Sequence, residues 1–275
     1  MNSLTKFLGI TALAVVVGFS IAPVAFAQAP ESDFRVSLTR DNRSVIIERY
    51  HGRATNVEIP ATIQGLPVRV IGHNAFDRSG LGSVTPRLTR VVIPEGIIII
   101  GDYAFSGQDR LTTIIIPSTV TGIGRGAFRN TGELRDFEFP QGVREIGESV
   151  LEGSRIRSFT WPAHITRIPD HAFRNSHIEN IVIPEGVTHI GRNTFTSCRN
   201  LRSITLPSTI RGIGAAAFVG TQLTSITIPE TVRSIQWAHW GEDVEGAFRA
   251  SRFDLATQAR LRDLGYTAWP YVVRN

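Results

Sequence analysis

The chain has 275 residues, of which 42% are hydrophobic, 19% charged and 8% aromatic, and its formal net charge at pH 7 is +5. This composition is typical of a globular protein with a sizeable core and excludes a wholly disordered chain. Cys198 is the single cysteine of the sequence, which excludes an internal disulfide framework and a multi-thiolate metal site.

Residues 1–27 have the pattern of a secretory signal peptide. Lys6 supplies a positive charge, residues 7–22 form an apolar run that is short for a membrane-spanning helix, and Ala25-Phe26-Ala27 matches the cleavage pattern of signal peptidase. No second apolar stretch of spanning length follows. We therefore expect an exported chain that begins at Gln28, has no membrane span after cleavage, and is periplasmic, secreted or held at the cell surface.

The region from residue 28 to 240 is predicted to consist of about eight repeats. Prolines recur every 22 or 23 residues after a longer first step, which we attribute to inserted residues including 78–87. The prolines of the series are Pro60, Pro94, Pro117, Pro140, Pro162, Pro184, Pro207 and Pro229.

Each repeat carries the same order of apolar positions. An alternating segment such as Leu111–Ile116 precedes the proline, and its first, fourth and sixth residues are predicted to face inward from a strand that the proline ends. Two apolar residues follow three and six positions after the proline, then usually a glycine, which we interpret as a bend, and a large apolar residue such as Phe105 or Phe128. One repeat alone could not bury these groups, so the repeats are expected to stack.

Residues 241–275 are predicted to form a C-terminal cap. A helix is expected at about 252–264, with Ser251 as N-cap and Gly265 just beyond its end. Trp237 and Trp240 fit either a ligand platform or the bulk that a cap needs, and we favour the cap.

The repeat pattern L-x-x-I-x-I-P-x-x-V-x-x-I-G-x-x-A-F resembles the BspA-like class of leucine-rich repeats of bacterial surface and exported proteins, from about Phe34 to Trp240. The resemblance implies a leucine-rich repeat solenoid of the α/β repeat class, mostly β, with parallel stacked strands and short helical or irregular segments opposite them. It also implies an atypical first repeat, here residues 45–60, that caps the core. Similar proteins are regarded as adhesins and surface antigens.

Candidate reactive groups do not converge in the repeat frame. His164, His171 and His189 occupy different positions relative to their prolines, so no metal site is expected, and the glycines at 122–126 lack a nucleotide-binding signature, so no cofactor is expected. Cys198 is interpreted as a packed structural residue, because no histidine shares its column in a neighbouring repeat. We therefore expect no enzymatic activity.

The outward positions of the predicted strands give the first candidate binding site. Val92 and Ile115 should lie side by side on neighbouring strands, and an outward apolar pair with a charged rim marks a contact surface. The remaining residues of this site are Arg90, Thr113, Asp136 and Glu138. The alternative is that the insertion 78–87 folds over the pair and buries it.

A second candidate is a row of arginines along the flank of the same strands, at Arg135, Arg157 and Arg202, interrupted by Glu179. Such a row suits an acidic glycan or an acidic protein. Nucleic acid is disfavoured, because the arginines are interspersed with acids and the chain is predicted to be exported.

Together these patterns predict a noncatalytic module that binds a protein or glycan ligand. One alternative is a self-associating envelope scaffold, suggested by the apolar run at 97–100 and by the outward pair of Val92 and Ile115. The other is an enzyme with an unrecognised site, which would need a convergent acid, base or nucleophile.

Overall fold

The structure is a computed structural model that describes residues 28–80, 85–235, 259 and 261–264. The predicted signal peptide, Trp237, Trp240 and most of the predicted C-terminal cap lie outside the described residues. Within the cap, residues 259 and 261–263 are helical, and Leu261 belongs to the buried apolar cluster. The domain boundaries at 27 and 240 stay predictions.

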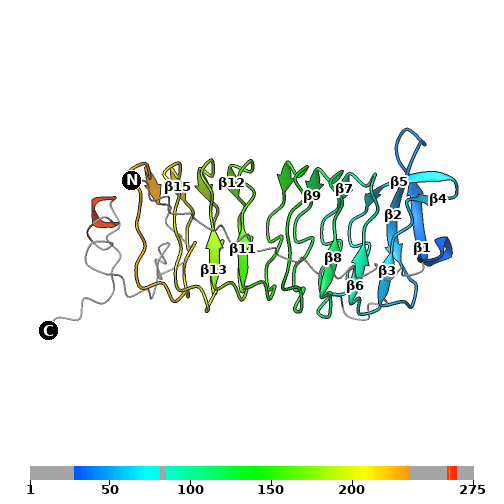
Figure 1. The fold of residues 1–275 in the computed structure, drawn as a ribbon, viewed down its shortest axis with the longest axis horizontal. Helices are drawn as coiled ribbons and strands as arrows, with labels where there is room; N and C mark the ends of the chain where they lie inside the picture. The colour runs from blue at the N-terminus through cyan, green and yellow to red at the C-terminus, as the bar shows by residue number, and fades with distance from the viewer. Residues whose placement is uncertain (1–27, 81–84, 236–258, 260, 265–275) are drawn as a thin grey trace, which may run out of the picture.

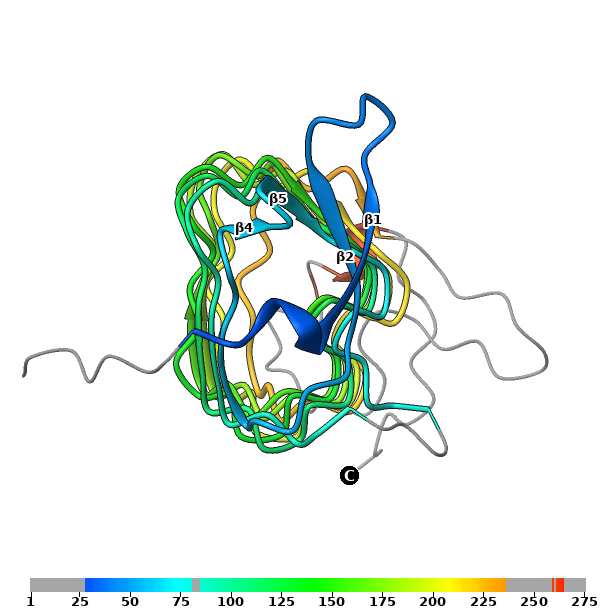
Figure 2. The same cartoon turned by 90° about the vertical axis from the view of Figure 1, so that its right-hand side faces the viewer.

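The described chain is an elongated stack of coils (Figure 1), which superpose when viewed along the stack (Figure 2). We number the coils 1 to 8 by the repeat prolines, so that coil 1 contains Pro60 and coil 8 contains Pro229. The structure thus confirms the predicted solenoid of parallel stacked strands with little helix.

Parallel strands just before the prolines form the first ladder. It pairs β3 (Asn56–Glu58) with β6 (Arg90–Val92) and β6 with β8 (Thr113–Ile115), and separately β11 (Ser158–Thr160) with β13 (Asn180–Val182). A bridge from Val182 to Thr205 continues it to coil 7. We call the outward side of this ladder the strand face.

Short strands after the prolines form a second ladder. One part runs in the order β1-β2-β5-β7-β9-β10 and the other in the order β12-β14-β15-β16. The strands of the coils are β5 (Leu66–Ile71), β7 (Ile99–Ile100), β9 (Gly122–Ile123), β10 (Glu145–Ile146), β12 (Arg167–Ile168), β14 (His189–Ile190), β15 (Gly212–Ile213) and β16 (Ser234–Ile235).

The N-terminal residues cap the open end of the stack, as predicted for an atypical first repeat. A short 3-10 helix η1 (Glu31–Asp33) crosses this end in Figure 2. It leads into β1 (Phe34–Leu38), which pairs antiparallel with β2 (Val45–Tyr50), and β4 (Thr62–Ile63) folds back antiparallel on β5. The rings of Phe34, Tyr50 and Phe76 pack together, with the centroids of Tyr50 and Phe76 5.3 Å apart. The first coil therefore presents a covered end to solvent.

The inward apolar positions of all coils share one core. Phenylalanines one coil apart stack nearly parallel: Phe105 and Phe128 have centroids 5.8 Å apart, and Phe195 and Phe218 5.5 Å. Each ring therefore packs against its neighbours along the axis, and the core is shared between coils.

The glycines after the second apolar position have a different role from the one predicted. Gly101, Gly124, Gly147, Gly191 and Gly214 are absent from the residues with positive φ, so they do not form left-handed bends. A Cβ on Gly191 would lie 2.6 Å from the backbone nitrogen of Asp170, and one on Gly214 2.5 Å from that of Arg192. Glycine is needed there because neighbouring coils approach closely, and the left-handed residues stand two positions later.

Candidate functional site

The structure places Val92 and Ile115 side by side, in register on β6 and β8, as predicted. Arg90 and Thr113 are paired two residues earlier on the same strands. The Ile115 side chain is 45% exposed, whereas Val92 is half-buried. The apolar pair is thus a real feature of the strand face, and its binding role stays a prediction.

The described part of the insertion packs away from this pair. The backbone N–H of Arg78 donates to the Ser106 carbonyl at 2.8 Å, and the backbone N–H of Leu88 donates to the Gln108 side chain at 2.8 Å. Both ends of the insertion therefore attach to coil 2 just after its recurrent phenylalanine. Residues 81–84 lie outside the described part. The described residues leave Ile115 exposed.

Asp136 and Glu138 are exposed, as predicted, but the strand predicted to carry them is missing. In the described chain, residues 136–138 pair with neither β8 nor β11. The two carboxylates therefore lie on an unpaired segment of coil 4, the coil that follows that of Ile115, rather than on a continuous sheet.

The predicted arginine row is partly neutralised. Arg135 lies 3.4 Å from Glu133, and Arg157 lies 3.7 Å from Glu179. Arg202 is exposed on coil 7. Exposed pairs of this kind are screened by water, so they contribute little to stability, but they lower the positive potential that an acidic ligand would meet.

Both ladders are interrupted between coils 4 and 5, a junction that we call the seam, and the first ladder is interrupted between coils 3 and 4 as well. The first ladder omits residues 136–138, and the second has no pairing between β10 and β12 in the described chain. On the third side the backbone bonds continue across the seam, from Ser149, Leu151 and Gly153 to Asp170, Ala172 and Arg174, at 3.0, 2.9 and 2.8 Å.

Pro169 explains the break in the second ladder. It stands where other coils have the closely packed glycine, whose N–H donates to the preceding coil, as Gly124 does to Ile100 and Gly191 to Ile168. Proline has no N–H to donate to Ile146, and its ring adds bulk where only glycine fits. Coil 5 therefore cannot approach coil 4 as the other coils approach each other.

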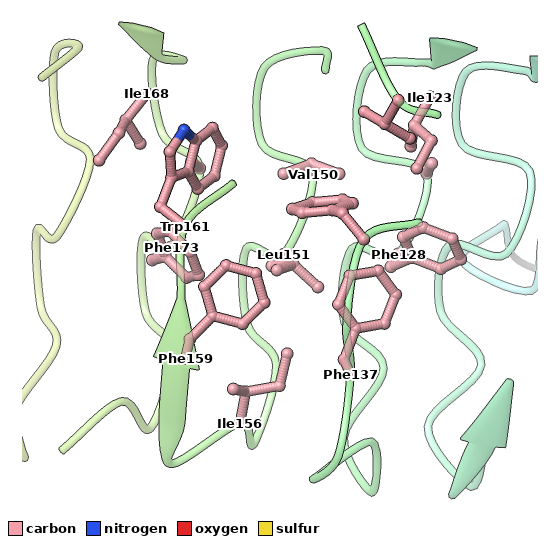
Figure 3. Packing of buried hydrophobic residues seen from close by; sticks show 14 of the residues in the cluster. Ile123, Phe128, Phe137, Val150, Leu151, Ile156, Phe159, Trp161, Ile168 and Phe173 are labelled. Carbon is pink, nitrogen blue, oxygen red and sulfur yellow. The ribbon is translucent and has the colours of Figure 1, made fainter. Parts of the chain in front are cut away.

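Aromatic side chains account for the break in the first ladder. The inward fourth and sixth strand positions hold Val, Ile or Leu in most coils, but Phe137 and Phe139 in coil 4 and Phe159 and Trp161 in coil 5. The ring centroids of Phe137 and Phe159 are 6.3 Å apart, so bulky rings meet where most neighbouring coils place smaller aliphatic side chains. Figure 3 shows these two rings on either side of the seam.

A groove of about 540 Å³ opens between the two strand segments at the seam. The aromatic side chains form its floor, and Phe137, Phe159 and Trp161 are at most 7% exposed. Its rim is formed by Glu138, Gln141, Ser158, Thr160, Pro162, Ala163, His164 and Pro184. Sequence reasoning missed this groove, although its signals are present: a proline in the glycine column and aromatic residues at two strand positions of two successive repeats.

Groups able to do covalent chemistry are dispersed or protected. The Cys198 thiol is fully buried, donates to the Phe173 carbonyl at 3.0 Å, and has its pKa raised by burial to about 12. It is therefore a neutral thiol and a poor nucleophile. Among the described residues, no three His, Cys, Asp or Glu side chains converge as metal ligands.

Comparison with known proteins identifies the repeat. The chain matches the family described as the BspA type leucine rich repeat region, in six copies, over residues 50–179 and 166–239. It belongs to this family.

Solved structures of bacterial leucine-rich repeat proteins have the same fold. A leucine-rich repeat protein of T. pallidum is 25% identical with a TM-score of 0.65, over 87% of this chain and 97% of that one. A leucine-rich cell surface protein of Faecalibacterium prausnitzii A2-165 is 26% identical with a TM-score of 0.65, over 80% of this chain and 58% of that one. No curated protein matches the chain.

The proteins that resemble this chain include one at the cell surface. In the described residues, no helix is both long enough and apolar enough to cross a bilayer.

Proposed function

We propose that this BspA-type chain is an exported, noncatalytic module that binds a protein through the part of the strand face around Val92 and Ile115. The observation that carries the proposal is the in-register pair of half-buried Val92 and exposed Ile115, with Arg90 on the same strand as Val92 and the exposed Asp136 and Glu138 on coil 4. In such a surface the apolar contacts supply affinity, and the surrounding charged groups orient the partner.

Export is supported by the signal-like pattern of residues 1–27 and by the cell-surface location named for the similar F. prausnitzii protein. A noncatalytic role is supported by the dispersed histidines and the buried, neutral thiol of Cys198. A glycan ligand is less favoured, because Arg135 and Arg157 are already paired with glutamates.

The test is a binding comparison with matched variants. The purified chain is used to capture and identify a partner from host and bacterial extracts, and the affinity is then measured by calorimetry with both proteins purified. Val92→Asp with Ile115→Asp is expected to weaken binding at least about tenfold, because it places two carboxylates in the contact.

Val182→Asp is the matched control, because Val182 lies on the same face, on β13, and is 58% exposed. It should leave the affinity unchanged. Equal binding by the Val92 and Ile115 double variant and the wild type would show that the contact lies elsewhere.

Self-association is the second candidate, favoured by a different surface. Ile99 is 44% exposed on β7 and pairs with Val70 of β5, which in turn pairs with Ile46 of β2, so an apolar row crosses three strands. Light scattering of the wild type and of Ile99→Asp separates the two candidates. A concentration-dependent oligomer that the substitution dissolves would favour the scaffold.

A further inference from the structure

The strand β11 is an edge strand inside the stack. The Arg157 carbonyl accepts from the backbone of coil 6, and the Trp161 N–H donates to Val182 at 3.0 Å. Since backbone groups of alternate residues point to opposite edges of a strand, those of Ser158 and Thr160 point towards coil 4. The described structure pairs β11 only with β13, so this edge faces the groove without a ladder partner.

An open strand edge next to an apolar floor presents the two features that bind an extended peptide. Its N–H and C=O groups can pair with the backbone of an added strand, and a pocket beside it can take alternate side chains. The floor of aromatic rings provides such a pocket, and Figure 3 shows Phe159 and Phe137 on its two sides.

The charge of the rim restricts the partner further. Glu138 is exposed and lines the groove, and Asp136 is exposed two residues earlier on the same coil. No arginine is among the residues that line the groove. An incoming side chain at this rim is therefore best matched by a positive charge.

We propose that the seam is a docking site for an extended peptide segment of a partner protein, in which an apolar side chain enters the groove and a neighbouring basic side chain meets Glu138. The segment adds a strand to the open edge of β11. A sugar ring is a poorer match, because the aromatic side chains form a nearly buried floor rather than an exposed flat surface for stacking.

The seam groove shares Glu138 with the surroundings of the proposed Val92 and Ile115 site, but its floor and open strand edge lie two or three coils from Val92. Val92→Asp should leave peptide binding at the seam unchanged, so that failure of the seam proposal and failure of the proposed function are distinguishable. Loss of peptide binding at the seam in Val92→Asp would place a single partner across both sites and would overturn the separation.

The experiment uses a phage-displayed library of random heptapeptides, selected on the purified exported chain. The expected enriched peptides alternate apolar and small polar residues and carry Arg or Lys beside the apolar position. A synthesised, fluorescently labelled peptide then gives the affinity by anisotropy. Glu138→Arg should weaken it at least about threefold, whereas Glu58→Arg, at the same strand position of coil 1, should not.

Backbone pairing is tested in the peptide, which leaves the protein fold untouched. N-methylation of the peptide amides that donate to β11 should weaken binding about threefold to tenfold. N-methylation of the intervening amides, which point away from β11, should have little effect. Absence of any enriched sequence, enrichment that Glu138→Arg does not affect, or equal tolerance of N-methylation at all positions would each overturn the proposal.

Discussion

Residues with positive φ recur at two fixed places in coils 2–7. One column contains Tyr103, Gly126 and Ala216, and the other contains Gly107, Gly153, Ser197 and Gly220. A side chain other than glycine or asparagine is strained in this conformation, because Cβ approaches the following carbonyl. The repeat tolerates such residues because the rest of the coil fixes the backbone.

Ser197 provides a test of this strain. Its φ is 60°, and glycine occupies the equivalent position in coils 2, 4 and 7. Ser197→Gly is expected to raise the free energy of unfolding by about 1 kcal/mol, measured by denaturant titration. Gly126→Ala should lower it, because the new Cβ would lie 2.5 Å from the Tyr103 ring. A destabilised Ser197→Gly variant would show that the column is not strained.

Two buried groups make the fold sensitive to alkaline pH. Burial raises the pKa of Tyr50 from 10.0 to about 12 and that of Cys198 from 9.0 to about 12. In both cases the unfolded chain loses its proton first. Their contribution to stability is therefore complete below about pH 9 and is lost as the pH rises towards 12.

We expect the free energy of unfolding to be level from neutral pH to about pH 9 and to fall above it. The Tyr50 hydroxyl donates to the Ala54 carbonyl at 3.2 Å, so Tyr50→Phe should lower stability by about 1 kcal/mol at neutral pH. The same variant should flatten the alkaline slope above pH 10, measured by urea titration at each pH. An unchanged slope would mean that Tyr50 ionises as freely in the folded chain as in the unfolded one.

At the scale of elements, the regular coils are predictable and the seam is not. The periodic prolines and the apolar positions around them specify strands, stacking and inward residues, because every regular coil repeats the same short sequence pattern. Val92 and Ile115 lie together for the same reason. The strand expected at Asp136 and Glu138 is absent, because that expectation ignored the size of the aromatic side chains beneath it.

The groove depends on how two neighbouring coils fit, which no single repeat encodes. When these glycines are interpreted as bends, their role in letting neighbouring coils approach closely is missed. The effect of Pro169, which stands at the same position in coil 5, is then missed as well. The insertion 78–87 could not be placed from sequence either, since its attachment to coil 2 rests on individual contacts such as that of Leu88 with Gln108.

Pro169 can be replaced to separate the two effects of proline. Pro169→Gly restores both an N–H and the space that the other coils have, so its amide should bond to Ile146 and exchange slowly in NMR hydrogen-exchange measurements. Pro169→Ala restores the N–H but keeps a Cβ that would collide with coil 4, as the Cβ contact of Gly191 with coil 5 indicates. Its amide should exchange faster. Equal protection in both variants would mean that steric bulk does not hold the seam open.

At the scale of the whole molecule, the seam divides one stack into two. The second ladder joins coils 1–4 and, separately, coils 5–8. Across the seam, backbone bonds remain on the third side of the coils, which follows the second ladder in the chain. The His164 side chain adds a bond to the Val143 carbonyl across the junction. The core continues through it by aromatic contacts such as Phe137 with Phe159. The chain is thus one hydrophobic stack with an opening at one junction.

Hydrogen exchange of the purified chain, followed by mass spectrometry, tests this account most directly. Slow exchange is expected in the strands of coils 1–3 and 6–8, and fast exchange in peptides covering residues 136–146 and 158–168, where backbone groups face the seam. Uniform slow exchange through these peptides would show closed ladders between coils 4 and 5. That result would contradict both the divided stack and the site proposed there.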